Sequence, residues 1–71
     1  MNIENISLTV HGMSCHHCAD TIRRSVESME GVERVNVHLT EKKVDVTYDG
    51  DKIDPDTIRV RIKGEGFDVK D

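Results

Sequence analysis

The chain has 71 residues, of which 34% are charged and 35% are hydrophobic, and its formal net charge is −4. This length allows one small core, and we expect residues 1–71 to form a single domain. The acidic balance of mixed charges argues against nucleic-acid binding, which usually requires a basic surface. No apolar run approaches the roughly 20 residues of a membrane span, so we expect no membrane insertion.

The start of the sequence and its two cysteines bear on the cellular compartment. From the first residues of the sequence we expect no secretory leader. Closely spaced cysteines without such a leader are typical of the reducing cytosol, where they bind metal or carry out redox chemistry. We therefore expect a cytoplasmic protein.

The first part of the chain predicts a strand followed by a helix. A half-buried strand is indicated by three alternating apolar residues, Ile6, Leu8 and Val10. An apolar helix stripe is formed by residues three and four apart, namely Ala19, Ile22, Val26 and Met29. We expect ion pairs between Asp20 and Arg24 and between Arg23 and Glu27 on the outer face of this helix. Gly31 supplies the left-handed residue that commonly ends a helix.

The second part predicts a hairpin and a second helix. Two alternating runs, residues 35–39 and 44–48, are joined by a short polar connection and indicate an antiparallel hairpin. Asp54 is a suitable N-cap, and Pro55 suits the first helical position. The buried face of this helix is carried by Ile58 and Ile62.

A short last strand, marked by Phe67 and Val69, completes the order strand, helix, strand, strand, helix, strand. Each long strand has one apolar and one polar face, so only one side of the sheet can be covered. Both helices must then pack on that side. We expect an α+β fold of the ferredoxin-like type, with two helices on one face of a four-stranded antiparallel sheet.

The only two cysteines of the chain lie in the motif Gly-Met-Ser-Cys-His-His-Cys, residues 12–18. We expect Cys15 in the loop after the first strand and Cys18 in the first turn of the first helix. Unpaired N–H groups and the helix dipole favour a thiolate there. Soft thiolates select Cu(I), zinc or iron–sulfur clusters over hard cations.

The number of ligands narrows the choice of metal. Structural zinc usually takes four protein ligands, and an iron–sulfur cluster usually takes four cysteines. Cu(I) accepts two thiolates, and such a site leaves room for a third sulfur from an acceptor protein. Thiol–disulfide redox activity is the alternative. A glutaredoxin-type fold would, however, need a helix where this chain predicts a hairpin, and a proline facing the thiols where Pro55 begins a helix.

The other residues of the motif and one aromatic residue are expected to support the site. His16 and His17 lie between the cysteines, where joint ligation of one ion is difficult, so we expect them to tune the charge of the site or to touch metal in a dimer. Met13 is expected to fill a gap in the core rather than to bind metal. Phe67 is expected to act as an apolar lid that keeps water from the thiolates.

The motif at residues 12–18 resembles the Gly-Met-x-Cys-x-x-Cys signature of the heavy-metal-associated domain family. Residues 30–37 and 66–69 are similar to the family's second strand and last loop, so the resemblance runs over nearly the whole chain. It implies the ferredoxin-like fold, with Cys15 and Cys18 as Cu(I) ligands. It also implies that Met13 lies under the metal loop and Phe67 beside the site.

The resemblance also implies a function. The family includes free-standing copper chaperones, amino-terminal domains of heavy-metal P-type ATPases and a mercury-binding branch. We expect a soluble, non-enzymatic chaperone that carries Cu(I) and delivers it by thiolate exchange to a copper-transporting P-type ATPase. The main alternative is an excised metal-binding domain of such an ATPase; a redox protein and a mercury or zinc carrier are further alternatives. Two copies could also share one ion as a metal-linked homodimer.

Overall fold

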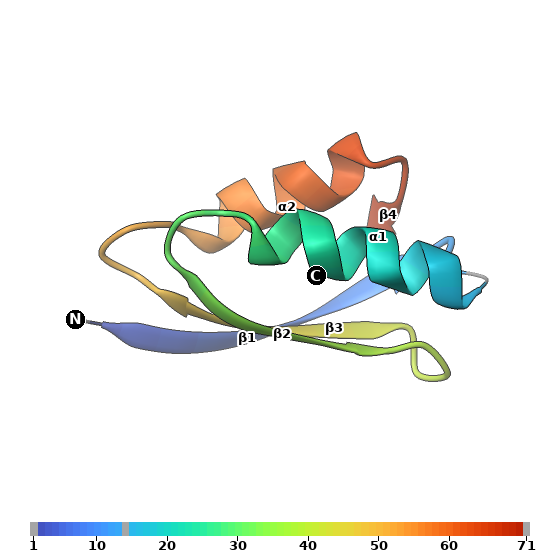
Figure 1. Ribbon diagram of the computed structural model, residues 1–71, viewed down its shortest axis with the longest axis horizontal. Coiled ribbons are helices and arrows are strands. Elements are labelled where there is room, and N and C mark those ends of the chain that lie inside the picture. Colours follow the sequence, from blue (N-terminus) through green and yellow to red (C-terminus); the bar gives the residue numbers. More distant parts are fainter. Residues whose placement is uncertain (1, 14, 71) are drawn as a thin grey trace.

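A four-stranded antiparallel sheet carries both helices on one face (Figure 1). The computed structural model describes residues 2–13 and 15–70. The elements, in chain order, are β1 (Ile3–His11), α1 (His16–Glu27), β2 (Val32–His38), β3 (Lys43–Asp49), α2 (Pro55–Gly64) and β4 (Asp68–Val69). The predicted element order and the ferredoxin-like arrangement are confirmed.

The strand order in the sheet is β2-β3-β1-β4. The register places Leu8 opposite Val44 and Val35 opposite Val46, so the apolar side chains of neighbouring strands lie on the same face. The short strand β4 pairs only with the end of β1, at Val10 and His11. Because β1 leads directly into the cysteine motif, this pairing places β4 beside it.

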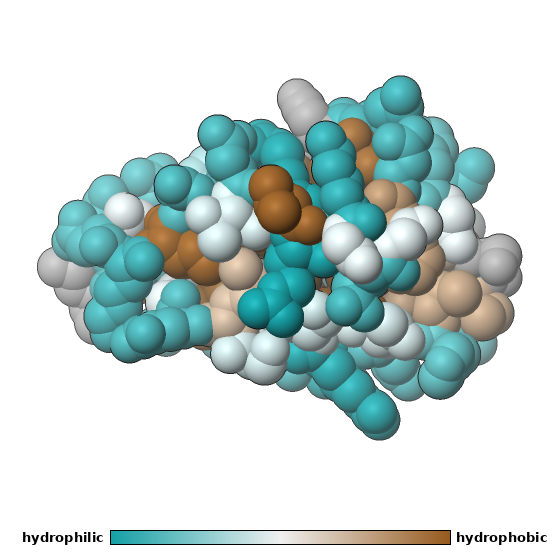
Figure 2. All heavy atoms as spheres, turned by 90° about the horizontal axis from the view of Figure 1, so that it is seen from above, coloured by the Kyte–Doolittle hydropathy of each residue, from teal (hydrophilic) through white to brown (hydrophobic). Residues whose placement is uncertain are grey.

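The core lies between the sheet and the two helices. Its largest fully buried side chains come from both layers: Leu8, Val10, Val44 and Val46 from the sheet and Ile22, Val26, Ile58 and Ile62 from the helices. The apolar faces expected for the strands and helices therefore meet as the alternation required. The outer face of the helical layer is largely hydrophilic (Figure 2). Neither of the described helices is long and apolar enough to cross a membrane.

Helix α2 begins as predicted. The Asp54 carboxylate accepts hydrogen bonds from the Thr57 N–H at 2.8 Å and from the Thr57 hydroxyl at 2.7 Å. These bonds satisfy a donor that the helix leaves free at its N-terminus. Pro55 occupies the first turn, where its missing N–H costs no helical hydrogen bond.

Two expectations for helix α1 were wrong. The helix ends at Glu27, so Met29 packs against the core from the following turn and Gly31 lies in the connection to β2. Arg23, rather than Arg24, lies near Asp20, at 3.7 Å, and it also binds Glu27, as expected, at 3.2 Å. One guanidinium reaches both carboxylates, because the positions three before it and four after it lie on the same side of a helix.

Gly31 allows the connection between α1 and β2 to approach the connection between β3 and α2 closely. Its φ is +98°, and a Cβ there would lie 2.9 Å from the Ile53 Cγ2 and from the Lys52 Cβ. We expect Gly31→Ala to lower the free energy of unfolding by about 1–3 kcal/mol, because it adds backbone strain and a clash. The measurement is urea denaturation followed by circular dichroism.

Gly64→Ala is the matched control for this prediction. It lies in α2, has no positive φ, and a Cβ there would meet nothing within 4 Å. We expect this alanine to leave stability unchanged or to raise it by up to about 1 kcal/mol. Equal losses in the two variants would show that Gly31 is not specifically required.

The Asp49 carboxylate closes the turn at the end of β3 and is only 5% exposed. It accepts hydrogen bonds from the N–H groups of Asp51 at 3.0 Å and Asn2 at 3.3 Å. The Asp51 N–H, helped by that of Asn2, lowers the pKa of Asp49, although burial opposes the shift. A carboxylate with a lowered pKa stabilises the fold above its unfolded-state pKa of about 3.9, and this contribution is lost as the pH falls through the folded-state pKa.

We expect Asp49→Asn to be less stable than the parent chain at pH 7. The difference should narrow below about pH 4, where the parent carboxylate takes up its proton. Urea unfolding at a series of pH values from 7 to about 2 measures this difference. A gap that stayed constant over the whole series would contradict the assigned role of the ionised carboxylate.

Candidate metal site

The cysteine motif lies at one end of the molecule. Figure 1 shows that the connection from β1 to α1 shares this end with the β2–β3 turn and the α2–β4 connection. Strand β1 ends at His11, and Gly12, with a φ of +103°, turns the chain out of the sheet. Ser14 lies outside the described residues. The loop therefore rests on a rigid strand on one side and on a helix on the other.

The two thiols lie close together at the N-terminus of α1. Cys15 is the N-cap residue and is exposed, whereas Cys18 lies in the first turn and is partly buried. Both are free thiols, and their Sγ atoms are 3.4 Å apart. The nearby backbone N–H groups of α1 form no capping hydrogen bond of ordinary geometry with the Cys15 side chain. Both sulfur atoms can therefore face a ligand without loss of a helix cap.

The surroundings of Cys15 favour its ionised form. The backbone N–H of Cys18 and, next, the Cys18 side chain lower the pKa of Cys15. Burial opposes this shift, and the backbone N–H of His17 adds to it. A sulfur at this position is thus more readily present as thiolate, which is the form that binds metal.

Two apolar side chains pack into the core next to the cysteines. Met13 is 6% exposed and belongs to the hydrophobic core, which agrees with the expectation that it fills a gap there. Phe67 is partly buried and packs against the same core. A Cβ on Gly12 would lie 3.4 Å from Phe67 Cδ1, so the ring lies against the start of the loop. A role for Phe67 as a lid over the thiolates stays a prediction.

Among the described residues, the histidines do not join the two cysteines in a larger group of possible metal ligands. His16 and His17 are both exposed on the first turn of α1. His11 is exposed at the end of β1, and His38 Nε2 lies 2.9 Å from Asp45 Oδ2 on the open face of the sheet. Within residues 2–13 and 15–70, no three His, Cys, Asp or Glu side chains form a group that could hold a metal ion. The described part of the candidate site thus offers two neighbouring sulfur atoms, of which that of Cys15 is exposed.

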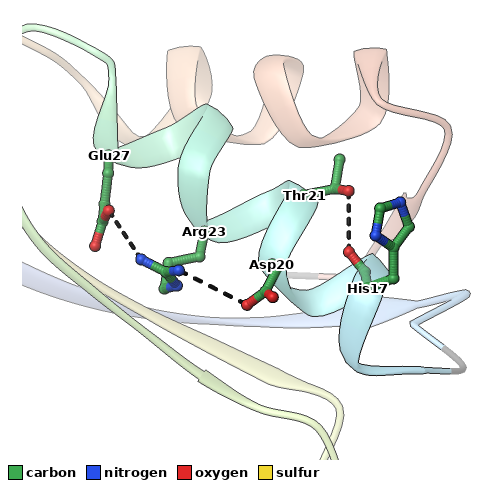
Figure 3. Close-up of polar contacts among 5 residues, drawn as sticks. All are labelled: His17, Asp20, Thr21, Arg23 and Glu27. Atoms are coloured by element: carbon green, nitrogen blue, oxygen red, sulfur yellow. Dashed lines mark hydrogen bonds and ion pairs between the residues drawn. The ribbon is translucent and has the colours of Figure 1, made fainter.

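Thr21 is a supporting residue that the sequence did not single out. Its hydroxyl donates a hydrogen bond to the His17 carbonyl at 3.0 Å (Figure 3). The contact ties the side chain of the second turn to the backbone between the cysteines. In a helix, a threonine hydroxyl can donate to the carbonyl four residues earlier, so the sequence allows this bond. It does not predict the bond strongly, because many helical threonines face solvent instead.

Comparisons with known proteins agree with this arrangement. The heavy-metal-associated domain family matches residues 7–68, which include both cysteines. The copper chaperone CopZ of Bacillus subtilis (strain 168) is 42% identical over 67 residues, covering 94% of this chain and 97% of that protein. Copper-transporting ATPase 1 of Mus musculus is 34% identical over 69 residues, which cover 97% of this chain but only 5% of the ATPase.

A solved structure gives the same picture of the fold. The yeast copper transporter domain CCC2A, determined in solution in the apo and Cu(I)-loaded states, has a TM-score of 0.87 and is 33% identical. The match covers 93% of this chain and 90% of that chain.

Proposed function

Because the chain belongs to the heavy-metal-associated domain family, we propose that it is a cytoplasmic copper chaperone that carries Cu(I) on the thiolates of Cys15 and Cys18. The chain is a binding domain and not an enzyme. The proposal rests on one observation: two free sulfur atoms lie 3.4 Å apart in a loop at a helix N-terminus. Similarity to CopZ over nearly the full length of both chains supports this choice.

The chemistry of the donors favours Cu(I) over Zn(II). Thiolates are soft ligands, and a two-sulfur site satisfies Cu(I), whereas a structural zinc ion would need two further ligands. The described part of the chain brings together no larger group of His, Cys, Asp or Glu. The yeast domain with the same fold was studied with Cu(I) bound, which supports this preference.

Transfer to an acceptor follows from the exposed position of Cys15. A thiolate of the acceptor forms a third copper–sulfur bond, and the bond to Cys15 or Cys18 then breaks. The copper stays monovalent throughout, and each sulfur that it leaves becomes a free thiolate or takes up a proton. The acceptor that we propose is a copper-transporting P-type ATPase, since a segment of copper-transporting ATPase 1 is similar to this chain. Two copies of the chain could share an ion in the same way.

That similarity also favours a second candidate function. The chain resembles only 5% of the mouse ATPase, so domains of this kind also occur inside long transport proteins. As such a domain, the chain would receive copper rather than deliver it. The length of the open reading frame in the genome separates the two functions.

Metal competition tests the proposal. The reduced chain is titrated with Cu(I) in the presence of a competing chelator, and in parallel with Zn(II) and Hg(II) at known free-ion levels. We expect tight uptake of Cu(I) at one ion per chain and much weaker uptake of Zn(II). Sedimentation at each ratio reports a metal-linked dimer. Failure to bind Cu(I), together with turnover of a disulfide substrate, would support the redox alternative instead.

A further inference from the structure

A groove runs between helix α1 and strand β2, next to the cysteine loop. Its volume is about 440 Å³. Its apolar lining is formed by Ala19, Val35, Val37 and Leu39. His16, which directly follows Cys15, lines the same groove. A chain segment bound there would therefore lie beside the metal ligands.

The charged side chains on the α1 side of the groove are already paired with one another. Figure 3 shows Asp20, Arg23 and Glu27 in a row along one side of the helix. Arg23 lies 3.7 Å from Asp20 and 3.2 Å from Glu27. Because Arg23 is shared between the two carboxylates, no unpaired lysine or arginine lines the described α1 side of the groove, which is suited to small apolar side chains rather than to an anion.

The β2 side of the groove is a sheet edge with outward-facing backbone groups. The Asp49 N–H donates to the Gly31 carbonyl at 2.7 Å. The backbone N–H and C=O groups of the odd-numbered residues of β3 therefore point toward β2. Asp45 is paired with Asn36, and by the alternation of an antiparallel ladder the backbone groups of Val35 and Val37 point away from β3. In the described part of the chain, none of the backbone hydrogen bonds outside the helices and the sheet ladders involves Val35 or Val37.

We propose that this edge binds an extended segment of the protein that receives the metal, as an added strand alongside β2. The inference rests on the proposed transfer function. Pairing with Val35 and Val37 supplies main-chain hydrogen bonds, and alternate side chains of the segment enter the groove. Extended recognition of this kind takes its affinity from the backbone and its selectivity from the pockets.

The charge next to the β2 edge indicates which side chains the bound segment carries on the open face of the sheet. Arg34 is exposed on the open face of the sheet, and although Glu33 lines the same surface pocket, none of the ion pairs among the described residues includes Arg34. Side chains of the segment that do not enter the groove would lie on this open face. The partner segment therefore alternates small apolar residues with acidic ones.

The edge is usable from Arg34 to the metal-loop end of β2. A register shift between Val32 and Arg34 interrupts the pairing of β2 with β3 at the far end, and bulges of this kind discourage strand addition. The free stretch is thus short, which suits a transient complex and keeps the bound segment close to His16. The exposed surface over the helices is largely hydrophilic (Figure 2).

The first test maps the binding of a peptide to the metal-free, reduced chain. The probe is acetyl-Val-Asp-Val-Asp-Val-amide, and the control is the same peptide with lysine in place of aspartate. We expect saturable shifts of the Val35 and Val37 amide signals and slower hydrogen exchange there, with little change in exchange at Asn36, whose N–H already faces β3. Absence of saturable shifts, shifts confined to α2, or equal binding of the lysine peptide would each overturn the proposal.

Dilution of the chain without peptide tests a second copy as occupant. If the Val35 and Val37 signals moved on dilution, the edge would be a self-association surface, and the proposed partner segment would be wrong. Unchanged signals support the proposal.

Two variants then test whether the groove contributes to the transfer of Cu(I). Val37→Pro removes the outward N–H, and proline is tolerated at a sheet edge; Val37→Ala keeps that donor and is its matched control. Ala19→Leu fills the groove without altering β2, and it decides the test if the proline variant fails to fold. We expect Val37→Pro and Ala19→Leu to lose the peptide shifts and to transfer Cu(I) about tenfold more slowly than Val37→Ala to the amino-terminal domain of a copper-transporting ATPase.

The affinity of each variant for Cu(I) distinguishes the proposed copper-carrying function from the proposed binding of a segment at the β2 edge. We expect that affinity to be unchanged in both groove variants, since neither substitution replaces a sulfur ligand. If the parent chain itself failed to bind Cu(I), the proposed function would be wrong, and the peptide map would still decide whether the edge binds an extended segment. If both variants bound the peptide and transferred copper like Val37→Ala, the groove proposal would be overturned.

Discussion

A chain with both Cys15→Ser and Cys18→Ser is expected to lose more than about 100-fold of its affinity for Cu(I), because even outer-shell partners of a metal contribute about 10–100-fold. The loss follows from the absence of other ligands: within the described residues no alternative group of His, Cys, Asp or Glu is assembled. The measurement is competition for Cu(I) against a chelator of known affinity, under strictly reducing conditions.

The serine variant should remain folded. Cys15 is the N-cap residue of α1, and serine is a preferred residue at that position. Circular dichroism therefore should show an unchanged helix. His38→Ala is a suitable control, because it removes an exposed imidazole outside the loop, and we expect it to bind Cu(I) like the parent. If the double variant held Cu(I) as tightly as the parent, the assignment of the metal site would be wrong.

Ile62→Ala is expected to destabilise the fold more than any surface change. Ile62 is fully buried between α2 and the sheet, and truncation of such a residue costs about 2–5 kcal/mol. Stabilities of small domains lie near the lower end of the range of about 5–15 kcal/mol. We therefore expect a large fraction of the variant to be unfolded in mild urea, as measured by circular dichroism.

Val60→Ala is the matched control in the same helix. Val60 is 67% exposed, and its removal opens no cavity. We expect a change within about 0.5 kcal/mol, the usual range for surface substitutions. A loss as large as that of Ile62→Ala would mean that Val60 contacts an apolar surface, for example in a dimer, and sedimentation of both variants would detect it.

The fold could be predicted from periodicity because each half-buried strand alternates and each helix repeats. The apolar residues of β1 and β3, such as Leu8 and Val44, are neighbours in the sheet, and Ile58 and Ile62 of α2 belong to the same buried core. The limits of α1 could not be predicted in the same way. Met29 keeps the helical spacing although it lies after the helix, because the turn that contains it still packs against the core.

The candidate site could be located from spacing alone, but its surroundings could not. A spacing of three positions from Cys15 to Cys18 is enough to place the two sulfur atoms together when the second lies in the first turn of a helix. The groove depends instead on which strand forms the sheet edge. The order β2-β3-β1-β4 is a property of the tertiary structure, and the alternation of Val35 and Val37 is the same for an edge strand and a central one.

The position of the sulfur pair at the start of α1 has an electrostatic consequence for the loaded protein. Two thiolates and one monovalent ion leave one unit of negative charge. The partial positive charge of a helix N-terminus stabilises such an anion by about 0.3–1 kcal/mol at an exposed position. A divalent ion held by the same two sulfurs would be neutral and would gain nothing from the helix. In the proposed Cu(I) complex, the helix N-terminus would therefore favour a monovalent ion over a divalent one through the charge of the complex, in addition to the preference of thiolates for soft ions.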